Sequence, residues 1–198
     1  MNITAIYSIG KMSFPSPWLA LVLTFILTGI ILRSQFSKTA SAQYSDFVLT
    51  FILVWKFSVI LTDFKMVLQQ PLTILYFNGG KLGVVLASLA VFVQAYRKRA
   101  TFSFAASAWA IALTQSGYQI IMVLVNDNAQ WIELTTLFIS SIALLMVVRK
   151  PTIATLQGFM GLHFIIALLQ PVALTQQLSW LLTIVATLAV VKWQKELK

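Results

Sequence analysis

The apolar segment PWLALVLTFILTGIILR, residues 17–33, carries no charged side chain before its last residue, Arg33. A helix of about 17–25 such residues crosses the hydrocarbon core of a bilayer. The rest of the 198-residue chain has the same character, since 59% of its residues are hydrophobic and only 10% are charged, with a mean hydropathy of +0.88. Soluble domains carry about 25% charged residues. The composition therefore predicts an all-α integral membrane protein that is solvated by lipid.

Apolar runs bounded by charges and turn residues recur along the chain and predict seven transmembrane helices. They cover residues 17–33, 45–62, 82–96, 103–125, 131–148, 152–170 and 177–193. We expect a single transmembrane domain over residues 1–198, because no long linker or low-complexity segment separates the runs. A signal peptide with Ala40-Ser41-Ala42 as its cleavage site is an alternative for the first run, but Arg33 and Lys38 intervene.

The basic residues predict the orientation of the helices. Ten of the fourteen Lys and Arg fall on one side of the predicted membrane: Arg33, Lys38, Arg97, Lys98, Arg99, Arg149, Lys150, Lys192, Lys195 and Lys198. The other side holds Lys11, Lys65 and Lys81. By the positive-inside rule, the N-terminus lies outside and the C-terminus in the cytoplasm. The net charge of +9 is then explained by topology and by attraction to anionic lipid headgroups, and not by a nucleic-acid partner.

Cysteine and histidine counts limit the chemistry. The sequence has no Cys and a single His, which excludes a thiolate nucleophile of its own and makes a transition-metal site improbable. No P-loop, GxGxxG or HExxH motif is present. We expect no metal and no cofactor.

Polar side chains within the predicted helices fall in the outer half of the bilayer. They are Lys56, Asp63, Thr114, Gln115, Tyr118, Gln119, Gln130, Glu133, His163 and Gln170. Such groups are costly in lipid and usually face a bundle interior or a wet cavity. We therefore expect a polar cavity open to the outer leaflet.

Each polar group also has a structural interpretation. Lys56 could pair with Asp63 or Glu133, and Glu133 could favour a helix N-terminus. His163 could be a satisfied core residue, and the Gln and Thr side chains of residues 103–125 could hydrogen-bond between helices.

A polar turn, YFNGGKLG (Tyr76–Gly83), interrupts two apolar runs. Paired glycines permit close backbone approach and a positive φ. We expect part of this turn to lie at membrane depth as a re-entrant or partly unwound entry to the third helix.

Several short motifs, in order along the chain, resemble the bacterial phosphatidylglycerol:prolipoprotein diacylglyceryl transferases. They are Ile9-Gly10-Lys11-Met12-Ser13-Phe14, Pro71-Leu72 with Phe77-Asn78-Gly79-Gly80-Lys81-Leu82-Gly83, Gln130-Trp131-Ile132-Glu133, Leu162-His163-Phe164, and Leu174-Thr175-Gln176-Gln177-Leu178-Ser179. The resemblance covers most of the chain. It implies a seven-helix bundle in the bacterial cytoplasmic membrane, with phosphatidylglycerol and a lipoprotein precursor as partners.

The chain differs from this family at positions where the resemblance implies catalytic or phosphate-binding residues. Asn78 stands where the resemblance implies His, and His163 where it implies Arg. The Glu and Arg expected further along the same helix are Ala167 and Gln170, and the family's long Gly-Arg signature is not recognisable near residues 115–119. Arginines can hold a phosphate bidentately and stabilise developing charge, which histidine and glutamine do not reproduce.

Three functions follow as hypotheses. The leading one is a catalytically degenerate member that binds a phospholipid or a membrane-anchored partner through Lys56, Asn78, Gly79, Gly80, Gln119 and Gln130. An active transferase with a rebuilt site is the alternative, with His163 as base, Lys56 as a lone phosphate cation and Glu133 orienting one of the two. A small transporter is the third, because intramembrane charge often marks an ion path.

Overall fold

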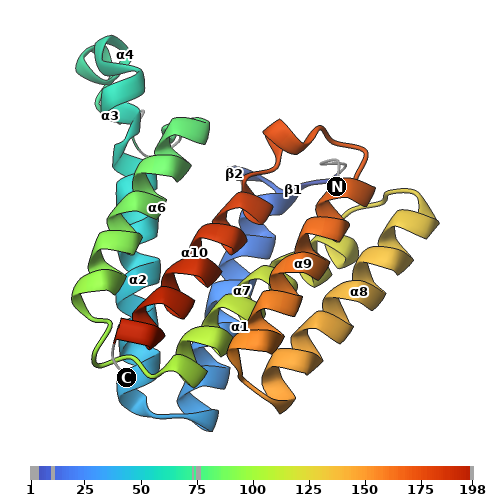
Figure 1. Cartoon of the computed structure of the whole chain (residues 1–198). Coiled ribbons are helices and arrows are strands. Elements are labelled where there is room, and N and C mark those ends of the chain that lie inside the picture. The colour runs from blue at the N-terminus through green and yellow to red at the C-terminus, as the bar shows by residue number, and fades with distance from the viewer. Residues whose placement is uncertain (1–4, 10–11, 73, 75–76, 197–198) are drawn as a thin grey trace. The chain divides into compact units, whose positions relative to one another are not determined.

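The computed structural model of the chain describes residues 5–9, 12–72, 74 and 77–196 (Figure 1). The elements are β1 (Ile6–Ile9), β2 (Met12–Pro15), α1 (Ser16–Gln35), α2 (Lys38–Phe57), α3 (Val59–Thr62), α4 (Phe64–Gln69), α6 (Gly80–Arg97), α7 (Phe104–Val125), α8 (Gln130–Arg149), α9 (Ile153–Leu169), the 3₁₀ turn η1 (Leu174–Gln176) and α10 (Leu178–Glu196). Gly10, Lys11, Tyr76 and Lys198, which the sequence singled out, lie outside the described residues.

Each predicted transmembrane run coincides with a helix, and five helices are long and apolar enough to cross a membrane. These are α1, α2 continued by α3 (Lys38–Thr62), α6, α7 and α8. The chain is therefore an all-α, multi-pass membrane protein, as predicted. Helix α9 has only 17 residues, and the last turns of α10 carry Lys192, Lys195 and Glu196. The count of seven spans and the orientation stay predictions.

The chain divides into two compact units. Unit 1 comprises residues 1–38 and 103–198, and unit 2 comprises residues 39–102. The expectation of one transmembrane domain over residues 1–198 stays a prediction.

Unit 1 is a helix bundle with α7 at its centre, packed against α1, α8, α9 and α10 (Figure 1). Small and polar residues suit α7 to this position, because they let neighbouring backbones approach. Helix α1 presents the same kind of face, since Ser16, Ala20, Thr24 and Thr28 recur at every fourth residue and are buried. A Cβ added to Gly117 of α7 would lie 3.2 Å from Thr24 Cγ2, so α1 and α7 pack closely there.

The buried core of unit 1 has an apolar cluster built from α7, α8, α9 and α10. We call it the apolar cluster: Ala108, Ala112, Ala143, Val147, Leu156, Phe159 and Val191. Large apolar side chains of the same helices, such as Phe138 of α8, point outward and are exposed. This placement of small residues inside and large apolar residues outside is expected where lipid, and not water, is the solvent.

Local signals set the helix boundaries of unit 1. Ser103 Oγ accepts a hydrogen bond from Ala106 N (3.2 Å) at the start of α7, and Thr152 and Thr155 form a capping box at the start of α9. These caps satisfy backbone donors that a helix leaves unpaired. Pro151 follows α8 by two residues and cannot continue it.

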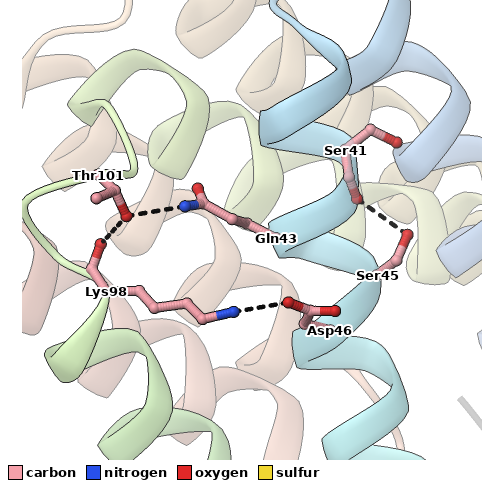
Figure 2. Close-up of polar contacts among 6 residues, drawn as sticks. All are labelled: Ser41, Gln43, Ser45, Asp46, Lys98 and Thr101. Carbon is pink, nitrogen blue, oxygen red and sulfur yellow. Dashed lines mark hydrogen bonds and ion pairs between the residues drawn. The ribbon is translucent and has the colours of Figure 1, made fainter.

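Unit 2 is an antiparallel pair of helices, α2 and α6, joined through α3 and α4. At one end, Lys98 Nζ donates to Asp46 Oδ2 (2.6 Å) and Gln43 Nε2 donates to Thr101 Oγ1 (2.8 Å), as Figure 2 shows. At the other end, α6 begins against the break between α2 and α3 at Ser58. Three large apolar side chains of α3 and α4 are exposed, namely Leu61, Phe64 and Leu68, whereas Val59 and Val67 are buried. The predicted run 45–62 includes α3 as part of one continuous helix, whereas the break at Ser58 and helix α4 were not predicted.

Candidate functional site

The predicted site residues are divided between the two units. Unit 2 holds Lys56, Asn78, Gly79 and Gly80, and unit 1 holds Gln119, Gln130, Glu133 and His163.

The glycine turn of unit 2 packs directly on the break between α2 and α3. Gly79 N donates to Trp55 O (3.3 Å), and Ser58 Oγ donates to the same carbonyl (2.7 Å). A Cβ at Gly79 or at Gly83 would overlap Ser58 Oγ, and Gly80 has a φ of +54°. The expected close backbone approach and positive φ are thus confirmed.

Asn78 supports this turn with its side chain. Its Oδ1 accepts a hydrogen bond from Gly80 N (2.9 Å), at the first residue of α6. The carbonyl oxygen of the side chain is therefore engaged in the turn. The amide group Nδ2 is a pure donor, so the chemistry that Asn78 can offer a ligand is donation to an acceptor such as a phosphate oxygen.

Lys56 lies one residue beyond Trp55, whose carbonyl accepts from Gly79, and its side chain is half-buried in the last turn of α2. Unit 2 therefore places the backbone next to Lys56 against the turn of Asn78, Gly79 and Gly80, at the N-terminal end of the 18-residue helix α6. A helix N-terminus carries a partial positive charge and favours anions.

The carboxylate of Glu133 in unit 1 accepts a hydrogen bond from the loop that precedes α8. Its Oε1 accepts a hydrogen bond from Asn128 N (2.7 Å), which fastens the α7–α8 connection to the first turn of α8. Gln130, the first residue of α8, is exposed, and Gln119 of α7 is buried. Glu133 thus has a structural role at the helix N-terminus, one of the interpretations left open by the sequence.

His163 is buried in the centre of α9, with 2% of its surface exposed. Its imidazole stacks on Phe159, with ring centroids 5.9 Å apart and planes at 19°. Among residues 5–9, 12–72, 74 and 77–196, no carboxylate is hydrogen-bonded to the imidazole.

Glu133 and His163 are not brought together. Gln170 Nε2 donates to Thr136 Oγ1 (2.9 Å), which fixes the register of the antiparallel helices α8 and α9. Glu133 lies three residues from Thr136 towards one end, and His163 lies seven residues from Gln170 towards the other. At about 1.5 Å per residue, the two are on the order of 15 Å apart along the bundle. This separation does not favour Glu133 as the group that orients His163.

A hairpin at the N-terminus covers the end of unit 1 that holds Glu133, and the sequence did not predict it. Strands β1 and β2 pair in antiparallel register, with Tyr7 opposite Phe14. Tyr7 Oη donates to Val125 O (2.9 Å), and Ser16 Oγ donates to Asn126 Oδ1 (2.7 Å). Ser16 just before an apolar run indicates where α1 starts, but it does not predict the two strands that precede that helix.

The two glycines of α9, Gly158 and Gly161, differ in how closely a neighbouring helix approaches them. A Cβ at Gly158 would lie 3.3 Å from Met146 Cε of α8, whereas a Cβ at Gly161 would meet no atom within 4 Å. Gly158 therefore has a close helix neighbour and Gly161 does not.

The chemistry open to these groups is binding of an anion or of a hydrogen-bonding ligand. In the part of the chain that is described, no three His, Cys, Asp or Glu side chains are grouped so as to hold a metal ion. No protein-family model matches this sequence, and no curated protein matches it either.

Proposed function

We propose that this protein binds a phospholipid with an anionic headgroup, phosphatidylglycerol being the first candidate, or a lipid-modified membrane partner. It would do so as a divergent relative of the prolipoprotein diacylglyceryl transferases in the outer leaflet of the bacterial cytoplasmic membrane. The observation that carries the proposal is the glycine turn of unit 2. There Asn78, Gly79 and Gly80 form the start of α6 close to Lys56.

Electrostatics supports an anionic headgroup at this turn. The side chain of Asn78 keeps its Nδ2 donors, because Oδ1 is the atom that accepts from Gly80. Lys56 adds a positive charge, and the first turn of α6 adds the partial positive charge of a helix N-terminus. Charge-assisted hydrogen bonds of this kind are about twice as strong as neutral ones.

Binding is favoured over catalysis by the state of the candidate catalytic groups. Glu133 accepts from a loop amide, and His163 lies about 15 Å from it along the bundle, by helical rise. Asn78 cannot act as a base near neutral pH. Diacylglyceryl transfer needs a base for the thiol and a stabiliser of the phosphate charge.

Lipid binding can be tested with the purified full chain in detergent by native mass spectrometry with phosphatidylglycerol and with phosphatidylcholine. We expect a preference for phosphatidylglycerol. Asn78→Asp retains the oxygen that accepts from Gly80 but replaces the donors with a negative charge, and Lys56→Gln removes the lysine charge. Each should weaken binding at least about tenfold, the worth of one charge-assisted hydrogen bond.

The matched control is Arg97→Gln, which removes one positive charge at the opposite end of α6 and should leave binding unchanged. Equal binding of the two lipids, or equal losses in all three variants, would contradict the proposal. A lipobox peptide incubated with phosphatidylglycerol should stay unmodified. Turnover that His163→Ala abolishes would establish the transferase alternative instead.

A further inference from the structure

The short helix α4 follows α3 at the end of the α2–α6 pair and, with the residues on either side of it, presents large apolar side chains at the surface (Figure 1). Leu61, Phe64, Leu68 and Leu72 keep 58–73% of their surface exposed. Exposed apolar groups that lie close together along a chain mark a contact with lipid or with another protein. A partner of one of these two kinds is therefore expected at residues 61–72.

The opposite end of the helix pair lies at a headgroup boundary. Lys98 and Asp46 form an ion pair there, both side chains are partly exposed, and Arg97 and Arg99 flank Lys98. Charged groups of this kind are costly in the hydrocarbon core and gather in the headgroup region. The ion pair therefore marks one face of the membrane for both α2 and α6.

Measured from this ion pair, α3 and α6 end just inside the far boundary of the hydrocarbon core. Thr62, the last residue of α3, comes sixteen residues after Asp46, and Gly80, the first residue of α6, comes eighteen residues before Lys98. At about 1.5 Å per residue these lengths are about 24 and 27 Å, and any tilt reduces the depth that they cover. The core is about 30 Å thick. Helix α4 begins at Phe64, so it lies close to the boundary between acyl chains and headgroups.

The backbone of the segment suits this depth, because amides at its turns find partners within unit 2. Asp63 N donates to Val59 O (2.9 Å), and Val67 N donates to Asp63 O (3.1 Å). Gln70 N donates to Met66 O (2.9 Å) at the end of α4. Backbone groups that lie next to acyl chains have no water to bond, so they need partners of this kind.

The side chains of α4 separate into an apolar side and a polar side. Phe64 and Leu68 are four residues apart and share one side, and Lys65 and Gln69 share the next. Val67 is buried. With about 3.6 residues per turn, the side of Lys65 and Gln69 faces away from Val67, and the side of Phe64 and Leu68 lies between the two. An exposed helix with one apolar and one polar side is typical of the membrane interface.

We infer that α4 lies in the membrane interface of the leaflet opposite the Lys98–Asp46 pair. Phe64 and Leu68 contact the lipid acyl chains there, and Lys65 and Gln69 face the headgroups. Lipid is favoured over a second protein as the partner, because the ends of α3 and α6 already place this segment beside acyl chains. The inference concerns acyl chains and not the headgroup preference proposed for the glycine turn, so each can fail without the other.

Spin labels test this placement, because the sequence has no Cys and one introduced Cys is labelled alone. Leu68→Cys and Gln69→Cys are each labelled with a nitroxide in the full chain and placed in vesicles of phosphatidylglycerol and phosphatidylcholine. Electron paramagnetic resonance measures collisions with oxygen, which concentrates in acyl chains, and with a nickel chelate, which stays in water. We expect the ratio of oxygen to nickel collisions to be several-fold higher at residue 68. Residue 69 is the matched control, because it is also exposed and lies on the polar side.

Two results would overturn the inference. Equal ratios at residues 68 and 69, or a lower ratio at residue 68, would show that the apolar side meets water. Low accessibility of residue 68 to both reagents would place it against protein, and spectral broadening that unlabelled protein removes would identify a second copy of the chain. Phe64→Cys, with Lys65→Cys as its control, repeats the comparison one turn away if Leu68→Cys does not fold.

Discussion

Units 1 and 2 differ in how they hold their helices together. Unit 1 buries side chains from five helices, with the apolar cluster of α7, α8, α9 and α10 in its interior and a second buried cluster between α1 and α7. Unit 2 has one helix pair and few buried residues, and it depends on contacts at its two ends. One end is the glycine turn against Ser58, and the other holds the Lys98–Asp46 ion pair.

The difference shows where each unit is sensitive. In unit 1, the exposed faces are large and apolar and the buried faces are small, so stability depends on side-chain volume in the interior. In unit 2, the helix pair depends on how closely its backbones approach at the glycine turn. The three predictions below test this contrast, in order of decreasing effect.

Removal of core volume from unit 1 should have the largest effect. Phe159 is fully buried in the apolar cluster and stacks on His163. Phe159→Ala should lower the free energy of unfolding by about 3–5 kcal/mol, because it leaves a cavity that helices can only partly close. Denaturant unfolding of the purified protein in mixed micelles measures this loss.

The matched control is Phe138→Ala on α8, a phenylalanine that is 66% exposed. It should change the free energy of unfolding far less. Equal losses in the two variants would show that the interior of unit 1 does not depend on volume, and the contrast between the units would fail.

Addition of one methyl group to the glycine turn should have an intermediate effect. A Cβ at Gly79 would overlap Ser58 Oγ and would lie 2.8 Å from Ser58 Cβ. Gly79→Ala should therefore destabilise the α2–α6 contact by about 1–3 kcal/mol, the usual cost of overpacking. Hydrogen exchange of the amides in α6 reports on this contact.

A double-mutant cycle isolates the cause. Ser58→Gly removes both close atoms, so Gly79→Ala should cost less in that background than in the wild type. Gly161→Ala is the control in unit 1, where a Cβ meets nothing within 4 Å, and it should be neutral or slightly stabilising. Equal costs of Gly79→Ala with and without Ser58 would disprove the steric explanation.

Loss of the ion pair at the other end of unit 2 should have the smallest effect. Lys98 and Asp46 keep 35% and 53% of their side-chain surfaces exposed, so water and salt screen the pair. Lys98→Met or Asp46→Asn should each cost about 0–1 kcal/mol, and high salt should reduce that cost. A loss comparable to that of Gly79→Ala would show that the polar end, and not the glycine turn, holds unit 2 together.

The helices themselves were predictable, because hydropathy is a property of consecutive residues. Every apolar run lies on helical residues, and five helices are long and apolar enough to cross a membrane. The paired glycines indicated the close approach and positive φ at residues 79–80. The paired strands Ile6–Ile9 and Met12–Pro15, the helix break at Ser58 and helix α4 were missed, since they depend on contacts with other elements more than on a local period. Tyr7 illustrates this, because its bond to Val125 spans 118 residues.

The candidate site was predictable only as a set of residue types. The sequence identified His163, Glu133 and Asn78 as unusual polar groups, but it could not say what each one contacts. Glu133 bonds to Asn128, Asn78 bonds to Gly80, and His163 lies far from Glu133 along the bundle. Whether Glu133 could orient His163 depended on helix registers, which no local pattern provides.

The sequence by itself determined that this chain is an all-α, multi-pass membrane protein and where its helices run, because lipid selects long apolar segments whatever their partners. Only the tertiary structure decided which distant polar side chains meet. Gln170 bonds to Thr136, 34 residues away in the chain, and Tyr7 bonds to Val125, 118 residues away. The reason is that the direction and register of each helix are fixed by contacts between helices, and not by the residues within one.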